Sequence, residues 1–285
     1  AEAVQALVKG KIDAVVIDNE PAKAFVDAND GLKILETPYV EEDYAMCFKK
    51  GNTELEDKFN AAIKELKEDG TFDKIVGYYI DGTEEKGYES PADVDHSNGK
   101  LVMATNAAFE PFEYTKGEDY YGIDMEIAKL LADELGKELV IENMDFDAVC
   151  LSVSQQKCDI AMAGLTINEE REEYVTFTDS YYSASQRLIV PSNVTTFDDC
   201  KTADDVAAKL AETKSSDQIG VQQGTTGQYY VEGSEDWDFP GLPAKCVTYK
   251  SGSLAVQDML NGNIQYVIID AAPASAITDA INAVQ

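Results

Sequence analysis

The sequence predicts an α/β fold of two lobes, with a mainly parallel sheet in each lobe and a two-strand hinge between them. Its 285 residues, 44% of them hydrophobic, exceed the length of one average domain. From residue 100 onward, short apolar strands alternate with amphipathic helices, which is typical of parallel sheets covered by helices. Residues 81–99 are polar, rich in Gly, Pro and Asp, and lack periodicity, so they are expected to be a linker.

The elements before this linker follow from apolar spacing and from breaker residues. Residues 1–10 predict a helix that Gly10 ends, and residues 12–18 predict a continuous apolar strand. A second helix is expected to begin at Pro21. The remaining expected elements are an extended segment at 32–40, a strand at 45–50, and an amphipathic helix with Leu55, Phe59, Ile63 and Leu66 on one face, ended by Gly70.

The elements after the linker alternate regularly. In the first lobe the expected elements are strand 100–106, a helix with Ile123, Ile127, Leu130, Leu131 and Leu135 on one face, strand 138–144, helix 147–156 and strand 158–164. A crossing strand at 187–193 leads into the second lobe, which should start near 193. Its expected elements are helix 202–212, strand 218–224, a helix from 226, strand 244–250, helix 253–261, strand 264–270 and helix 273–283.

Composition excludes several classes of partner. With 54 acidic and 23 basic residues, the net charge of −31 would repel phosphate backbones and anionic lipid surfaces, so we expect no nucleic-acid partner. No apolar run approaches the roughly 20 residues that span a bilayer. Five cysteines without C-x-x-C spacing and a single histidine make a zinc site improbable, and we expect neither a metal nor a cofactor. Cys200 with Cys246 is a candidate disulfide.

The stretch 161–182 concentrates small and hydroxyl residues, one arginine and an aromatic pair. An apolar strand ends at Gly164 and Thr166, and Arg171 follows within a short helix opened by Asn168. Backbone amides, a hydroxyl and a guanidinium in this order could clamp one carboxylate. The alternative is that Arg171 pairs with neighbouring glutamates on a solvated helix face, and both readings stay open from the residues alone.

The two ends of the chain are versions of one segment. Residues 3–28 match residues 255–280 at a constant offset of 252, with 13 identities in 26 positions and no gap. The identities include Gly10 with Gly262 and Asp18 with Asp270. An apolar pattern alone would not produce such a run of identical residues, so the sequence contains an internal duplication.

Several motifs together resemble the amino-acid-binding solute receptors of ABC importers, which have the type II periplasmic binding protein fold. They are ATNAAFEPFEY (104–114), YYGIDMEIAKLLADELG (120–136), DFDAV (145–149), AMAGLTINEER (161–171), FTDSYYSASQ (177–186) and IGVQQGTTGQYY (219–230). The resemblance covers residues 100–285 in the family's usual order, but the family's final third stands at the front, in residues 1–80.

This order implies a chain cut from a tandem array of two receptors of the polar amino acid family. The expected division is 1–33 as a surplus or permuted segment of lobe 2, 34–80 as the C-terminal part of lobe 1, 81–99 as the linker, 100–192 as lobe 1 and 193–285 as lobe 2. Either copy of the duplicated segment could complete lobe 2. We expect the surplus copy to pair with a neighbouring chain in an exchanged homodimer or longer assembly.

The resemblance implies roles for individual residues. Arg171, with Gly164 and Thr166, would bind the ligand's α-carboxylate, aided by Thr225 and Thr226 at a strand-to-helix turn whose amides suit an anion. Asp270 or Asp18, each ending an apolar strand, would bind the α-ammonium. The alternative for such an aspartate is the N-cap of the following helix.

The side-chain pocket is expected to contain Phe109, Phe112, Phe146 and Asn106. Asn106 replaces the aspartate found in many relatives that bind cationic side chains, which favours a neutral polar ligand. Since this cleft offers an asparagine and phenylalanines rather than an acid or base, we expect no catalytic residue and no enzymatic activity.

The function implied by the resemblance is extracytoplasmic binding of a free, polar amino acid in the cleft between two lobes, and delivery to an ABC permease. Such a protein is expected to be periplasmic or extracellular and associated with the cell surface. The alternatives are the ligand-sensing domain of a membrane receptor and an enzyme derived from the same scaffold.

Overall fold

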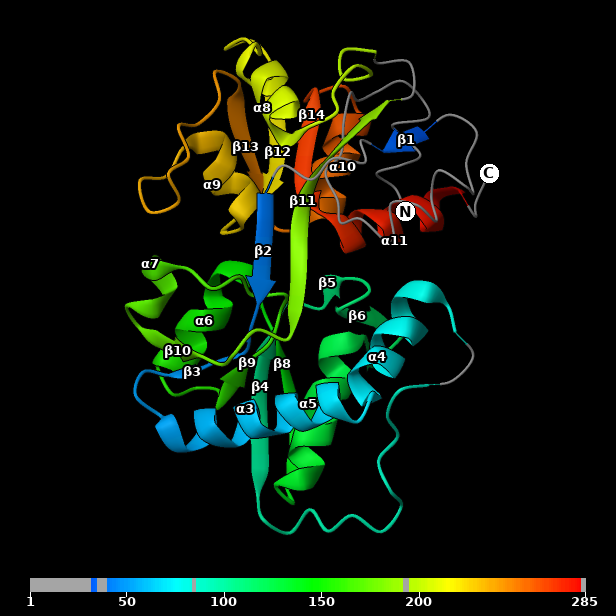
Figure 1. The fold of residues 1–285 in the computed structure, drawn as a ribbon, viewed down its shortest axis with the longest axis vertical. Helices are drawn as coiled ribbons and strands as arrows, with labels where there is room; N and C mark the ends of the chain where they lie inside the picture. The colour runs from blue at the N-terminus through cyan, green and yellow to red at the C-terminus, as the bar shows by residue number, and fades with distance from the viewer. Residues whose placement is uncertain (1–31, 35–39, 84–85, 192–194, 283–285) are drawn as a thin grey trace. The chain divides into compact units, whose positions relative to one another are not determined.

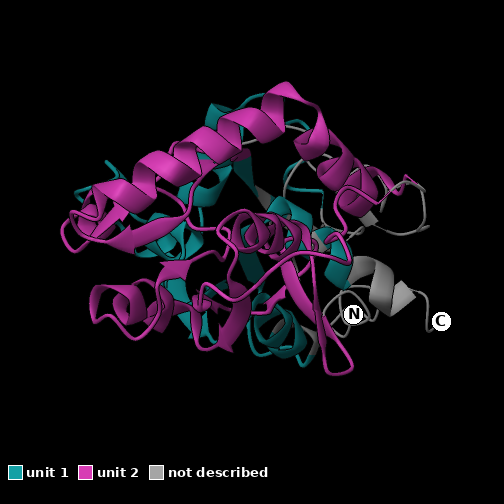
Figure 2. Cartoon of the chain, turned by 90° about the horizontal axis from the view of Figure 1, so that it is seen from below, with its two compact units in different colours: residues 1–42, 184–285 teal, residues 43–183 magenta. Residues whose placement is uncertain are grey.

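The computed structural model describes residues 32–34, 40–83, 86–191 and 195–282. They form two compact units, each drawn in one colour in Figure 2. Unit 2 is residues 43–183, and unit 1 is residues 1–42 with 184–285. The chain passes from one unit to the other inside strand β2 (Val40–Tyr44) and inside strand β11 (Tyr182–Pro191). These crossings lie just after the extended segment expected at 32–40 and just before the strand expected at 187–193.

Unit 2 is built on a five-stranded sheet with the order β10-β3-β9-β4-β8 (Figure 1). Its strands are β3 (Cys47–Lys49), β4 (Lys100–Thr105), β8 (Glu138–Asn143), β9 (Ile160–Ala161) and β10 (Val175–Phe177). β4 pairs in parallel with β8 and β9, whereas β3 is antiparallel to both β9 and β10. The sheet thus combines a parallel half with an antiparallel half, and its antiparallel strand β3 comes from a distant part of the chain.

The described helices of unit 2 are α3 (Thr53–Glu68), α4 (Thr71–Val76), the π-helix η1 (Gly77–Asp81), α5 (Ile123–Glu134), α6 (Phe146–Ser154) and the short α7 (Glu169–Glu172). The longer ones bury an apolar face. Asn52 caps α3 by accepting a hydrogen bond from the amide of Leu55, and Phe59, Ile63 and Leu66 are the buried face that the spacing predicts. Gly70, at φ +80°, separates α3 from α4.

A small antiparallel sheet in unit 2 is absent from the sequence prediction. Its strands are β5 (Ala108–Phe109), β6 (Glu113–Lys116) and β7 (Asp119–Tyr121), in the order β5-β6-β7. Its strands have two to four residues each, too few for an alternating pattern to be recognised. This sheet carries Phe109 and leads directly into α5.

Unit 1 has a sheet with the order β1-β11-β14-β12-β13, and β2 also pairs with β11. Its further strands are β1 (Leu32–Ile34), β12 (Gln218–Gln222), β13 (Lys245–Tyr249) and β14 (Tyr266–Asp270). Its helices are α8 (Ala203–Ala211), α9 (Thr226–Glu232), α10 (Gly252–Leu260) and α11 (Ala271–Asn282). A capping box of Thr202 and Asp205 begins α8.

Among the described residues, the C-terminal copy of the duplicated segment contributes a strand to the sheet of unit 1. β14, from the C-terminal copy, pairs antiparallel with β11 and parallel with β12. The expected elements within residues 1–31, including strand 12–18 and Asp18, lie outside the described residues.

The segment expected to be a linker is fastened to helix α5 where the structure describes it. Asp133 of α5 accepts hydrogen bonds from the hydroxyls of Tyr88, at 2.7 Å, and of Ser90, and its other oxygen lies 2.6 Å from Nε2 of His96. Two turns earlier along α5, Glu126 accepts a bond from the backbone amide of Tyr88 at 3.0 Å. We call residues 86–99 the strap.

Candidate functional site

Arg171 is a buried cation with a fixed orientation. Its side chain is 6% exposed, and its Nη1 donates to the carbonyl oxygen of Thr166 at 2.7 Å. The guanidinium carbon lies 5.4 Å from the centre of the Phe146 ring, a cation–π contact. Asn168 caps α7 by accepting a bond from the amide of Arg171 at 2.8 Å, which explains why the backbone turns there.

The exposure of α7 bears on the solvated-face reading of Arg171. Glu169, Glu170 and Glu172 are exposed, whereas Arg171 is buried in unit 2. A charge pair on a solvated helix face would leave the guanidinium in water as well. The structure therefore does not place the guanidinium on such a face.

Gly164 and Thr166 lie on the same loop as Arg171. Thr166 is 5% exposed and forms a β-bridge with Tyr44. Gly164 adopts φ +53°, and a Cβ at this position would lie 2.8 Å from the ring of Phe109, so only glycine fits here. The amide of Gly164 donates to Asp124 at 3.1 Å, so this N–H is used within the protein.

The predicted side-chain pocket residues lie in the same unit. Nδ2 of Asn106 donates to the carbonyl oxygen of Met144 at 2.7 Å, and Phe146 follows two residues later. The rings of Phe109 and Phe112 are 6.0 Å apart. Phe112 is fully buried and packs edge-on against Tyr44, so it belongs to the core that supports Phe109.

Asp124 is a site-supporting residue that the sequence did not reveal. It lies in the first turn of α5, is 0% exposed, and accepts hydrogen bonds from the Gly164 amide and, at 2.8 Å, from the Tyr181 hydroxyl. Burial raises the pKa of Asp124 to about 6, although these bonds and one with Glu113 act to lower it. Glu113 is also 0% exposed.

In unit 1, Thr225 and Thr226 lie at the start of α9, as predicted. Thr225 is the N-cap residue, and its hydroxyl donates to the carbonyl oxygen of Gln222 at 2.8 Å. Thr226 is 3% exposed, and its hydroxyl donates to Oε2 of Glu42 at 2.8 Å.

Asp270 ends β14 within a cluster of buried polar groups, which we call the acid–amide cluster: Glu42, Gln186, Thr226 and Asp270. Nε2 of Gln186 donates to carboxylate oxygens of both Glu42 and Asp270. These residues are 0% to 6% exposed. The sequence analysis did not single out Glu42 and Gln186. Glu42 stands in an acidic run, EED, and Gln186 follows an aromatic pair, so both resemble ordinary surface residues.

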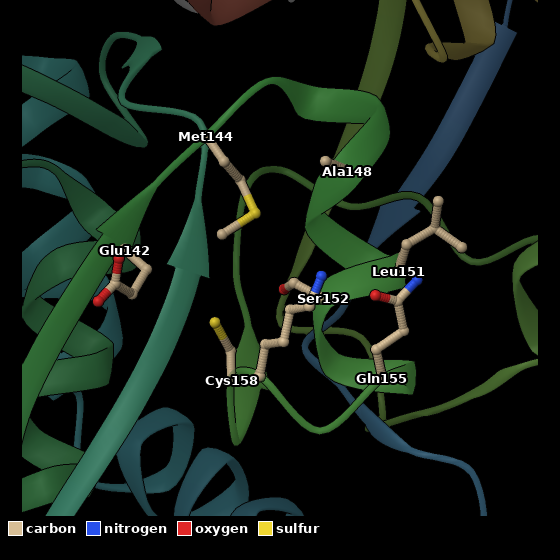
Figure 3. Close-up of a pocket in the computed structure, with 8 residues that line it drawn as sticks. Glu142, Met144, Ala148, Leu151, Ser152, Gln155 and Cys158 are labelled. Carbon is tan, nitrogen blue, oxygen red and sulfur yellow. The ribbon is translucent and has the colours of Figure 1, made fainter.

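A separate pocket of about 400 Å³ lies elsewhere on unit 2 (Figure 3). It is lined by Glu142 and Met144, by Ala148, Leu151 and Ser152 of α6, by its C-cap Gln155, and by Lys157 and Cys158. Met144 extends into the space between β8 and α6 in this view. It contains none of the predicted ligand-binding residues, and its lining gathers no convergent charged groups, so it is not the candidate site.

The described residues contain no group of His, Cys, Asp and Glu side chains that could hold a metal ion. In the same part of the chain, no helix is long and apolar enough to cross a membrane.

With this geometry established, comparison with known proteins defines the class. Residues 101–270 match the model of bacterial extracellular solute-binding proteins, family 3, and the chain belongs to this family. The two-lobe fold predicted from the sequence is confirmed by solved structures. The structure of holo ArgBP from T. maritima matches with a TM-score of 0.54 and 31% identity. The match covers 65% of this chain and 74% of that chain.

Two curated relatives illustrate the family. The chain is 30% identical to the ABC transporter arginine-binding protein 1 of Escherichia coli over 61% of its length and 64% of that protein. It is 28% identical to the histidine-binding periplasmic protein of Salmonella typhimurium over 62% of each. The chain thus spans less than two thirds of the length of these relatives. They are binding proteins rather than enzymes.

Proposed function

We propose that this protein binds a free polar amino acid outside the cytoplasm and delivers it to an ABC permease. The observation that carries the proposal is the buried, oriented guanidinium of Arg171, which is 6% exposed and packs on Phe146. An arginine in such a place suits bidentate binding of a carboxylate. Membership of the solute-binding family supports the same function.

The roles of the other residues extend this proposal. In unit 2, Thr166 and the loop from Gly164 assist Arg171 with the α-carboxylate. In unit 1, Thr225 and Thr226 offer the start of α9 to the same anion, and Asp270 accepts the α-ammonium. Glu42 and Gln186 orient Asp270, because Gln186 bonds to both carboxylates.

The ligand's side chain would contact Phe109, Phe146 and Asn106. The two curated relatives are named for arginine and histidine. We propose a neutral polar amino acid for this chain, because Asn106 supplies an amide where a cationic ligand calls for a carboxylate.

A thermal-shift screen of the twenty amino acids identifies the ligand, since a ligand at 100 times its dissociation constant stabilises the folded protein by about 2.7 kcal/mol.

Calorimetry on an arginine variant tests the clamp. Arg171→Ala should weaken binding of the amino acid found in the screen by about 30-fold or more, because losing one side of a buried charged hydrogen bond costs about 2 to 5 kcal/mol. Lys64→Ala, which removes a cation with 74% side-chain exposure, is the matched control and should bind like the parent. A folded Arg171→Ala protein that binds within threefold of the parent would place the clamp elsewhere.

Two further parts of the proposal concern the native context. We propose that the chain is cut from a tandem array of two receptors, as the duplication of residues 3–28 at 255–280 suggests. We also propose that it acts at the cell surface, in an exchanged homodimer.

A further inference from the structure

Two of the five cysteines lie side by side in the core of unit 2. All five are free thiols, so the candidate bridge between Cys200 and Cys246 is not formed. The Sγ atoms of Cys47 and Cys150 are 3.8 Å apart, and the two side chains are 0% and 5% exposed. They share one apolar cluster with Ala45, Val149 and other residues of β3, α6 and β9.

The pair joins two pieces of unit 2 that are distant in sequence. Cys47 lies in β3, opposite Ala161 of β9 on one side and Phe177 of β10 on the other. Cys150 lies in α6, the helix that begins with Phe146 and so with the ring under Arg171. Along the chain, residues 43–80 are joined to residues 100–183 through residues 81–99, which include the strap.

We propose that Cys47 and Cys150 are a modification site, a dithiol that a small-molecule disulfide oxidant converts to a disulfide within the chain. The bond fastens the N-terminal piece of unit 2 to the rest of its sheet. The sulfur atoms would move from 3.8 Å apart to a bond length of about 2.05 Å.

The two thiols differ in reactivity. Burial raises the pKa of Cys47 well above its ordinary value, whereas the hydrogen bond that Cys47 donates lowers the pKa of Cys150. The positive charge of Arg171 favours the thiolate at both positions. Cys150 is therefore the attacking nucleophile and Cys47 the thiol that resolves the intermediate.

The exchange balances in two steps. Cys150 first gives its proton to water, and its thiolate attacks the S–S bond of the oxidant, forms a mixed disulfide and releases one small thiolate. That thiolate takes the proton of Cys47, whose sulfur then attacks Sγ of Cys150 and displaces the second small thiolate, which takes up the proton that Cys150 released. Two protein S–H bonds and one oxidant S–S bond are replaced by one protein S–S bond and two small-molecule S–H bonds, so the protein is oxidised and the oxidant reduced.

Peptide mapping of the full chain tests this site, with oxidised glutathione as the probe. Because the folded pair is buried, the oxidant is supplied during refolding from urea as well as to the folded protein. Trypsin cleaves after Lys33, Lys49, Lys137 and Lys157, which places Cys47, Cys150 and Cys158 in separate peptides. We expect a peptide that joins Cys47 to Cys150, and an intact mass lower by two hydrogen atoms.

A stability measurement accompanies the map. The oxidised protein should melt about 5 °C or more above the reduced protein, because the bond closes a loop of about 100 residues. Cys158→Ser should keep both results, and Cys150→Ser should lose both. The inference is overturned if both thiols remain alkylatable after refolding in excess oxidant, if unresolved glutathione adducts accumulate, or if Cys47 and Cys150 join different chains.

Discussion

At the scale of single residues, Asp124 holds the loop that carries the proposed carboxylate clamp. It connects α5 to the amide of Gly164 and to the hydroxyl of Tyr181. Its pKa is raised to about 6 by burial, above the ordinary 3.8 of an aspartate. A raised folded-state pKa stabilises the fold below the unfolded-state value, and this stabilisation is lost as pH rises through the folded-state value.

The expected size follows from this shift. The free energy of unfolding of the parent, relative to that of Asp124→Asn, should fall by about 2 kcal/mol between pH 4 and pH 7. Other titrating groups cancel in this difference. Urea unfolding at several pH values measures it. Asp73→Asn, at an exposed position, is the control and should show no such slope. A constant difference between parent and Asp124→Asn over this range would show that Asp124 stays ionised throughout.

Sequence reasoning at this scale proposes roles for residues that are close together in the sequence. Thr166 and Gly164 lie in the loop before α7, and Nη1 of Arg171 in α7 donates to the carbonyl oxygen of Thr166. It missed Asp124, Glu42 and Gln186, whose partners are 40 to 184 residues away. An acid in an amphipathic helix normally faces water, and no local pattern distinguishes one that faces the core.

At the scale of elements, the strap depends on two acidic residues of α5. Burial acts to raise the pKa of Asp133, but hydrogen bonds from Ser90, His96 and Tyr88 outweigh it and lower this pKa. The carboxylate is thus the form that holds the strap. The polar composition of the strap predicted a linker. Composition alone does not show that a polar segment binds to a helix.

Removing this acceptor should loosen the strap locally. In Asp133→Asn, amide hydrogen exchange in residues 86–99 should be at least about 10-fold faster, because hydrogen bonds to a charged group contribute about 1.5 to 3 kcal/mol. Exchange in β4 and β8 should stay unchanged. Glu134→Gln, the exposed neighbour on α5, is the matched control. Equal protection of the strap in all three proteins would show that Asp133 does not hold it.

The sequence predicted best those helices and strands that are long enough to show their apolar periodicity. The expected helix 202–212 is α8 at Ala203–Ala211, and the expected strand 264–270 is β14 at Tyr266–Asp270. The position of β3 between β9 and β10 was not predictable in this way. Its three residues pair with strands more than 100 residues later, and such register is set by tertiary packing.

At the scale of the whole molecule, the duplicated segment (residues 3–28 and 255–280) raises the question of where each copy pairs. β14 of the C-terminal copy already lies between β11 and β12. A second apolar strand with the sequence of residues 12–18 would need the same neighbours. We therefore expect it to pair with another chain, since an apolar strand edge recruits further strands.

Light scattering coupled to size exclusion tests this assembly. The full chain should have the mass of a dimer or more, and a variant lacking residues 1–30 should have the mass of one chain. Amino-acid binding of the shortened variant serves as the control for folding. A full chain that stays monomeric at high concentration, with no change on deletion, would rule out the exchanged assembly.

The position of β3 also affects how the chain is made. A ribosome completes β3 and α3 long before it reaches β9 and β10, the strands on either side of β3. During this interval the unit 2 sheet, against which Phe59, Ile63 and Leu66 of α3 are buried in the structure, still lacks β4, β8, β9 and β10. Non-local pairing of this kind slows folding and exposes the growing chain to aggregation. Synthesis of this protein should therefore depend on chaperones that shield its N-terminal piece until the second half of unit 2 emerges.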